Sequence, residues 1–129
     1  MRKRSTGARG ETAVCRYLRL RGYLILERNY RKKCGEIDII ARRGRYLCFV
    51  EVKTRSKNAM GEPSRYVTFQ KQRKIIKTAS SFLCGNNFEL MPRFDIAEVS
   101  KIGLLFKVRY IKNAFCVNEH NDPTYCGSC

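Results

Sequence analysis

An apolar run from Tyr46 to Val50 is followed at once by Glu51, Val52 and Lys53. Five apolar residues in a row predict a buried strand, and a carboxylate with an ammonium at its end is unusual for such a strand. Side chains two residues apart on a strand share a face, so we expect Glu51 and Lys53 about 6.6 Å apart. Such a pair can hold a metal ion and a water or form a salt bridge, and this stretch leaves both interpretations open.

A second strand is predicted over residues 36–41, where acidic and apolar residues alternate, and residues 42–45 carry a turn signal between the two strands. We expect the hairpin to close around Arg43-Gly44, which would pair Ala41 with Tyr46. Directly opposed residues of such a hairpin share a face of the sheet. This register therefore predicts which side chains meet.

The two faces of the predicted hairpin differ in character. One is almost wholly apolar and is expected to lie on the core: Ile37, Ile39, Ala41, Tyr46, Cys48, Val50 and Val52. The other gathers four charged residues at one end: Glu36, Asp38, Glu51 and Lys53. Carboxylates so close together repel one another unless a cation lies among them, and both Lys53 and a divalent metal are candidates.

Converging carboxylates suit a hard cation such as Mg²⁺, which prefers oxygen ligands and keeps several waters. The bound metal would lower the pKa of a water and polarise a phosphoryl oxygen, and basic clusters nearby would hold phosphates. The cluster therefore predicts a metal-dependent phosphodiesterase, with a plain ion-pair network as the alternative. Glu36 is expected to pair with an arginine, and Asp95, close after Arg93, is interpreted as structural.

The remaining pattern predicts the element order α-β-β-β-α-β-β. Helical periodicity runs from Gly10 to Gly22 and from Thr68 to Leu83. Further strands are expected at residues 23–26, 94–99 and 104–111, with a basic connector from Arg28 to Lys33. We predict an α/β domain with a mixed sheet flanked by helices (10–112), after a basic arm (1–9) and before a polar, cysteine-bearing tail (113–129).

A formal net charge of +16 on 129 residues, with the basic residues in clusters, suits a polyanion, most simply nucleic acid. An acidic membrane surface and a merely solubilising surface are the alternatives. No apolar stretch reaches 18 residues and no apolar signal core follows the basic N-terminus, so we expect no membrane span and a cytoplasmic protein.

The seven cysteines mostly lie inside apolar segments and are expected to be buried thiols, as at Cys15, Cys48 and Cys84. The C-terminal segment adds a CxxC formed by Cys126 and Cys129, with Cys116 and His120 upstream. Four such ligands can bind zinc, but the spacing fits no common zinc motif. Incidental thiols are the favoured interpretation there.

Several motifs in this order resemble the YraN-like family of uncharacterised bacterial proteins, within the restriction-endonuclease-like or PD-(D/E)xK superfamily. They are Gly10-Glu11, Gly22-Tyr23, Arg28-Asn29, Gly35-Glu36-Ile37-Asp38, Phe49-Val50-Glu51-Val52-Lys53-Thr54-Arg55, Lys71-Gln72 and Arg93-Phe94-Asp95. The Asp of the superfamily pattern follows Gly-Glu-Ile here instead of a proline. The tail lies outside the resemblance.

The resemblance implies a fold like that of archaeal Holliday-junction resolvases and a metal-dependent endonuclease acting on structured or branched DNA. It implies Mg²⁺ or Mn²⁺ on Asp38, Glu51 and the Val52 carbonyl, with Glu11 facing the metal and Lys53 as the catalytic lysine. A nucleic-acid-binding protein of the same fold that does not cut is the alternative.

DNA is favoured over RNA as the partner, and a homodimer is expected because junction nucleases often act as dimers. The residues expected to contact nucleic acid are basic or amide side chains near the site: Arg31, Lys32, Lys33, Arg55, Lys71, Gln72 and Lys74.

Overall fold

The elements follow in the predicted order. The computed structural model describes residues 6–55, 67–86, 89–118 and 120–122. Its helices and strands are α1 (Thr6–Leu20), β1 (Leu24–Lys32), β2 (Gly35–Arg43), β3 (Tyr46–Arg55), α2 (Phe69–Asn86), β4 (Met91–Ile102) and β5 (Leu105–Phe115). The predicted α/β, restriction-endonuclease-like architecture is confirmed.

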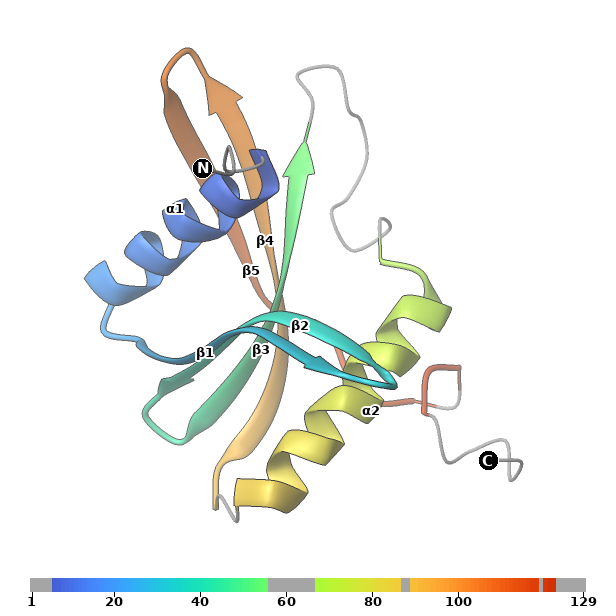
Figure 1. Ribbon diagram of the computed structural model, residues 1–129. Coiled ribbons are helices and arrows are strands. Elements are labelled where there is room, and N and C mark those ends of the chain that lie inside the picture. The colour runs from blue at the N-terminus through green and yellow to red at the C-terminus, as the bar shows by residue number, and fades with distance from the viewer. Residues whose placement is uncertain (1–5, 56–66, 87–88, 119, 123–129) are drawn as a thin grey trace.

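The five strands form one mixed sheet in the order β1-β2-β3-β4-β5. Strands β3 and β4 are parallel, and the other neighbours pair in antiparallel fashion. A parallel pair needs a crossover connection, and α2 lies on that connection. Figure 1 shows α1 and α2 beside different parts of the strongly twisted sheet.

Each face of the sheet packs on its own helix. In β2 and β3, Ile39 and Val50 belong to the cluster around α1, whereas Ile40 and Phe49 belong to the cluster around α2. The prediction that the apolar face lies on the core is confirmed for Ile39, Ala41, Cys48 and Val50, and the other face is buried near the turn as well. Strands covered on both faces lose the simple alternation of apolar and polar residues, which explains why both faces carry apolar side chains near the turn.

The hairpin register differs from the predicted one. Arg43 pairs with Tyr46, and Ala41 pairs with Cys48 instead of Tyr46. The two-residue turn therefore consists of Gly44 and Arg45, and Gly44 has a φ of 57°, which glycine adopts without steric cost. Each partner moves by two positions, and an even shift keeps every side chain on its face. Asp38 and Glu51 thus stay on one face.

Ile37 is a second departure from the predicted faces. It is buried with the α2 cluster, although Ile39, two residues on, packs with the α1 cluster. The alternation breaks between them, at Asp38. Tyr46, also assigned to the core, is 38% exposed.

The ends of several elements extend beyond the predicted bounds. Residues 28–32 belong to β1, so the predicted basic connector was wrong. An exposed edge strand can carry many basic side chains, and its sequence then lacks the apolar pattern by which a strand is predicted. Helix α1 begins at Thr6, inside the segment predicted as an arm, and β5 reaches Phe115, inside the predicted tail. No helix among the described residues is long and apolar enough to cross a membrane.

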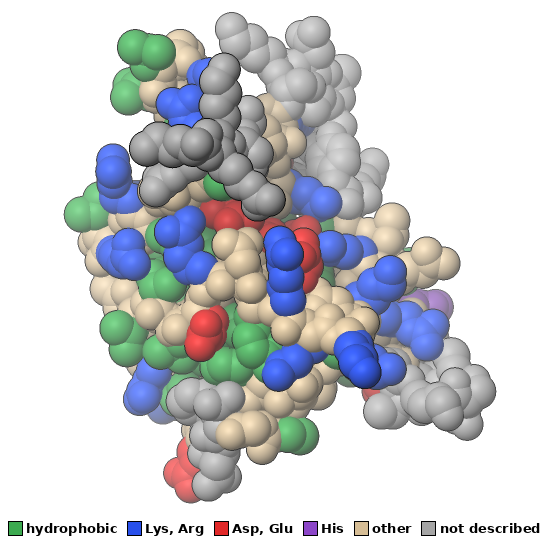
Figure 2. Space-filling model, in the orientation of Figure 1, with side chains coloured by type: hydrophobic (Ala, Val, Ile, Leu, Met, Phe, Trp, Pro, Cys, Tyr) green, Lys and Arg blue, Asp and Glu red, His purple; other side chains and the backbone are tan. Residues whose placement is uncertain are grey.

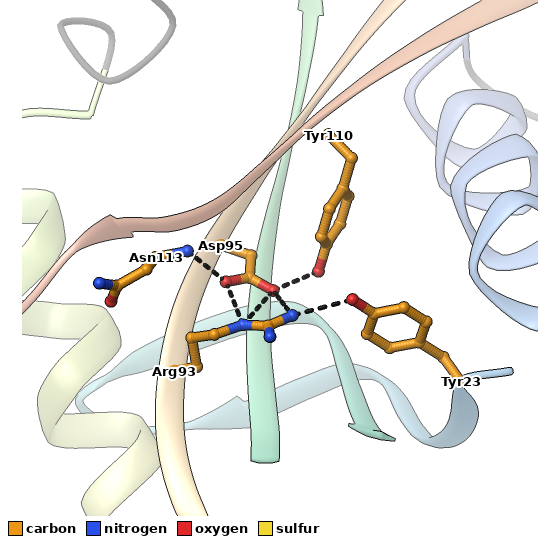
Figure 3. A network of polar contacts seen from close by, with 5 residues as sticks. All are labelled: Tyr23, Arg93, Asp95, Tyr110 and Asn113. Carbon is orange, nitrogen blue, oxygen red and sulfur yellow. Dashed lines mark hydrogen bonds and ion pairs between the residues drawn. The ribbon is translucent and has the colours of Figure 1, made fainter. Parts of the chain in front are cut away.

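A buried polar network joins β4, β5 and the start of β1 (Figure 3). Asp95 is fully buried and accepts hydrogen bonds from the Arg93 guanidinium, from the Tyr110 hydroxyl and from the backbone N–H of Asn113 at 2.8 Å. Arg93 also donates to the Tyr23 hydroxyl at 2.9 Å. The structural interpretation of Asp95 is confirmed, because its carboxylate satisfies groups on β4 and β5.

Replacing Asp95 by Ala should destabilise the fold by about 3–5 kcal/mol, because the Arg93 guanidinium would be left buried without its partner. Urea denaturation measures the change. The control Glu36→Ala breaks the exposed Arg31–Glu36 pair (3.1 Å) and should cost about 0–1 kcal/mol. Equal losses for both variants would contradict a special role for the network.

Candidate active site

Asp38 lies where β2 separates from β3. The pairing of these strands ends at Ile39–Val50, so Asp38 and Glu51 are the next residue on each strand. Instead of a continued ladder, the Val52 N–H donates to Asp38 Oδ2 at 2.8 Å. The N–H and C=O of one strand residue face the same neighbour, so the Val52 carbonyl is directed into the same gap.

Glu51 is buried and has two lysines beside it. Its Oε1 lies 3.7 Å from Lys53 Nζ on the same strand and 3.8 Å from Lys71 Nζ on α2. Burial, and then the charge of Asp38, raise the pKa of Glu51 to about 7, although both lysines act in the opposite direction. The salt bridge left open by the sequence is therefore present, but it does not neutralise the site.

The pKa of Asp38 is also raised. Burial raises the pKa of Asp38, and the nearby Glu36 charge adds to the effect, while the hydrogen bond from Val52 and the Lys71 charge oppose it. The charge of Asp38 in turn raises the pKa of Glu51. A buried acid beside a half-buried one forms a site that favours an added cation.

Glu11 approaches the same site from α1. Burial raises the pKa of Glu11, and the Asp38 charge raises it further, whereas a hydrogen bond with the Asn29 side chain lowers it. Figure 2 shows acidic side chains near the middle of one face with lysines and arginines around them. Across the described ranges, however, no three Asp, Glu, His or Cys side chains converge closely enough to hold a metal.

The donor set fits a divalent cation of the Mg²⁺ or Mn²⁺ type. Asp38 and Glu51 supply carboxylate oxygens, and the Val52 carbonyl faces the same gap. Oxygen-only ligation by two carboxylates, completed by waters, is characteristic of Mg²⁺. A cation between the two acids would also offset the cost of burying their charges, which is the largest cause of both raised pKa values.

Asn29 was not among the predicted site residues. It has a φ of 52°, a left-handed conformation that asparagine tolerates better than most residues. Its position in β1 lies across from Asp38, where the pairing of β1 and β2 skips from Arg28–Ile39 to Tyr30–Ile37. The Arg28-Asn29 motif was the sequence signal that pointed to this position.

The predicted nucleic-acid contacts lie in different surroundings. Arg31, Lys32, Lys33 and Lys74 are exposed. Arg55 is largely covered and binds Glu98 at 3.0 Å, while Lys71 contacts Glu51 in the site itself. Gln72 is buried: it donates to the Val67 carbonyl and accepts from Asn121, so its amide holds the segment after β5 against α2.

The cysteines follow the prediction in part. Cys15 and Cys48 are buried thiols, and burial followed by the Asp95 charge raises the pKa of Cys48 to about 12. Cys84 is exposed, so its predicted burial was wrong. Cys126 and Cys129 lie outside the described residues, and His120 stacks on Phe69 with ring centroids 5.3 Å apart.

Comparison with known proteins matches the sequence that carries this site to a family. A family profile described as "Uncharacterised protein family UPF0102" matches residues 10–99. A UPF0102 protein of Caldanaerobacter subterraneus subsp. tengcongensis is 46% identical over 118 residues, which cover 88% of this chain and 96% of that protein. UPF0102 proteins of Alkaliphilus metalliredigens and Clostridium botulinum (strain Loch Maree) are 44% and 45% identical, covering 87% and 84% of this chain and 98% and 92% of their own.

In the absence of divalent cations, Glu51 should make the folded protein less stable as the pH rises. The folded state with a Glu51 pKa of about 7 holds a proton that the unfolded chain releases near its ordinary pKa of 4.5. The favourable contribution of Glu51 to the free energy of unfolding is therefore complete below pH 4.5, and it is lost as the pH rises through about 7. Glu51→Gln should remove this dependence and be more stable than wild type at pH 8 by about 1–3 kcal/mol.

Urea denaturation in EDTA at pH 5 and pH 8 measures this difference. Glu89→Gln, which removes an exposed acid outside the site, controls for the loss of one negative charge. A difference between wild type and Glu51→Gln that stays the same at both pH values would contradict the burial of a repelled acid pair.

Proposed function

This chain belongs to the UPF0102 family, a member of the restriction-endonuclease-like superfamily, and on that premise we propose that it is a metal-dependent endonuclease. Its substrate is structured or branched DNA, in which it hydrolyses phosphodiester bonds. The observation that carries the proposal is the pair of buried Glu51 and half-buried Asp38 at the strand separation, with Lys53 and Lys71 both on Glu51.

Each residue of the site has a role that its position supports. Asp38, Glu51 and the Val52 carbonyl would hold Mg²⁺ or Mn²⁺, and Glu11 would act on the ion through its charge. The bound cation supplies an activated water and polarises a phosphoryl oxygen. Lys53 has a side chain 36% exposed, so its ammonium can reach a phosphate outside the acid pair and stabilise the charge that develops there.

Basic residues on two elements extend this site into a surface for phosphates. The β1–β2 turn packs on α2: a Cβ added to Gly35 would lie 3.3 Å from Lys74 Cβ. Lys32 and Lys33 are exposed on that turn and Lys74 is exposed beside it. A backbone that runs along this surface brings a phosphate towards Lys71 and Glu51, and its binding should weaken with salt.

DNA is the proposed substrate because the motifs of this chain resemble those of junction-cleaving DNA nucleases. Charge alone supports binding to the phosphates of DNA and RNA alike, so the substrate panel contains both. We propose a cytoplasmic location, as expected for a protein that acts on DNA. The second candidate function is a non-cutting nucleic-acid-binding protein. It is favoured by the finding that no three metal-binding side chains converge among the described residues.

Asp38→Asn and Lys53→Ala should each lower metal-dependent cleavage by roughly a hundredfold or more, because one removes a ligand charge and the other a charge on the phosphate. A panel of labelled duplex, flap, junction and single-stranded DNA and RNA, each with Mg²⁺ or Mn²⁺, measures cleavage. Binding should persist in both variants, and Asp38→Asn should bind slightly tighter since it loses a negative charge.

Glu89→Gln is the matched control, because Glu89 is an exposed acid between α2 and β4, outside the site, and it should cleave like wild type. Cleavage that survives both site variants would exclude the proposed site. Salt-sensitive binding by wild type with no product on any substrate would favour the second candidate function.

Lys71 and Lys74 separate a role in the site from a role in binding. Lys71→Ala should lower the cleavage rate at saturating DNA by roughly 10- to 100-fold, because its ammonium lies 3.8 Å from Glu51 Oε1. Lys74→Ala removes the same charge from the same helix and should raise the DNA concentration needed for half-maximal rate, with little change in the maximal rate. Single-turnover kinetics distinguish the two, and identical behaviour would assign Lys71 to phosphate binding alone.

A further inference from the structure

Strand β5 is an outer strand of the sheet, and among the described strands β4 alone pairs with it. An outer strand presents a row of backbone N–H and C=O groups that another strand can bind. Natural proteins often block such an edge by covering it or by placing charges on it. The side chains of β5 therefore indicate what kind of strand this edge accepts.

On one face, β5 and α1 enclose a groove of about 320 Å³ whose lining is mainly apolar and includes Leu20, Leu105, Phe106 and Val108. Leu20 is 79% exposed and Leu105 is 75% exposed. Figure 1 shows α1 beside the β4–β5 hairpin, and Figure 2 shows hydrophobic side chains at the tip of that hairpin. Apolar surface of this kind on a protein with a net charge of +16 is not needed for solubility and indicates a contact surface.

On the opposite face, β5 carries cations. Lys107 and Arg109 are exposed and alternate with Phe106 and Val108 along the strand. The β4 residue opposite Arg109 is Glu98, which is buried and bound by Arg55. The charged residues that line the groove are also cations, Arg16 and Arg21, with no acid among them. An incoming strand would thus meet apolar side chains on one face and positive charges on the other.

We propose that the β5 edge and its α1 groove bind an extended segment of a partner protein in which apolar and acidic residues alternate. The segment adds to the sheet as a sixth strand. Its apolar side chains enter the groove beside Phe106 and Val108, and its acids lie opposite Lys107 and Arg109. Main-chain hydrogen bonds provide affinity, and the alternating side chains provide selectivity.

Charge complementarity selects this occupant over a second copy of the chain. Two β5 strands paired side by side would place Lys107 and Arg109 of one copy beside those of the other, and like charges on neighbouring strands repel. A nucleic acid would satisfy the cations but would leave Leu20 and Leu105 without an apolar partner. An acidic and apolar strand satisfies both faces.

The proposal is independent of the nuclease proposal. The groove lies on α1 and β5, whereas Asp38 and Glu51 lie on β2 and β3. A partner bound there would leave the acid pair open to DNA and could hold the protein at a larger complex.

The first experiment uses wild-type protein and a fluorescein-labelled, eight-residue peptide of alternating valine and glutamate, with fluorescence anisotropy as the readout. Three control peptides test the mode of binding. One has four valines followed by four glutamates. The other two have the alternating sequence and are N-methylated at every other residue, one at the odd and one at the even positions. Binding by the alternating peptide alone is expected. Equal binding by the block peptide or by both N-methylated peptides would overturn strand addition.

The second experiment locates the site. Lys107→Glu with Arg109→Glu should weaken peptide binding roughly tenfold, because two attractive pairs become repulsive. Arg45→Glu with Lys77→Glu makes the same change in net charge at exposed positions outside β5 and should leave binding unchanged. Equal losses in both double variants would reduce the effect to overall charge and overturn the proposal.

A third pair of measurements separates protein from nucleic acid as the occupant. Leu20→Ser with Leu105→Ser should weaken the peptide and leave the binding of a single-stranded oligonucleotide unchanged. In NMR spectra, the peptide should shift β5 amide signals and slow their hydrogen exchange. Displacement of the peptide by an oligonucleotide that depends equally on Leu20 and Leu105 would assign the groove to nucleic acid and overturn the proposal.

Discussion

The parallel ladder between β3 and β4 is the constraint on which the rest of this structure depends. It runs without a shift from Tyr46–Met91 to Arg55–Ser100 and places strands from the two halves of the chain side by side. A parallel pair cannot be closed by a tight turn, so the chain must cross the sheet, and α2 covers one face as a result. The opposite face packs on α1, and β3 is therefore buried on both sides over most of its length.

Burial on both faces explains the chemistry of the site. A carboxylate at the end of a strand that lies on the surface would be solvated, whereas Glu51 is almost wholly enclosed between β2, β3 and α2. The separation of β2 from β3 at Asp38 brings a second acid and the Val52 backbone into the same enclosed space. The raised pKa values of both acids follow from this geometry, and a cation between them would relieve the repulsion. Lys53 and Lys71 then lie at the rim, where they can meet phosphate without neutralising the acids completely.

The two ends of the sheet differ in what they offer to partners. The β1–β2 turn and α2 present cations around the acid pair, which suits a phosphate backbone. The β5 edge presents cations on one face and apolar groups on the other, which suits an acidic and apolar strand. Basic residues of this protein, whose net charge is +16, thus form two surfaces. One surrounds a pair of acids, and the other adjoins apolar side chains.

Most of the fold followed from local pattern. Apolar periodicity predicted the order of elements, and period-two alternation placed Asp38, Glu51 and Lys53 on one face even though the turn was placed one residue too early. A shift of the register by two residues leaves each side chain on the same face of the sheet, so the misplaced turn did not change the predicted site. Patterns within one segment are read directly from the chain, because neighbours in sequence are neighbours in a strand or helix.

Contacts between distant segments depended on packing. The meeting of Lys71 with Glu51, the burial of Gln72 against Asn121 and the change of face at Ile37 all join residues whose relative positions the sequence pattern does not express. Gln72 and Lys71 are adjacent on α2, yet one is structural and the other lies in the site, because the helix turns by about 100° per residue. Which of the two residues faces the site is decided only when α2 packs on the sheet.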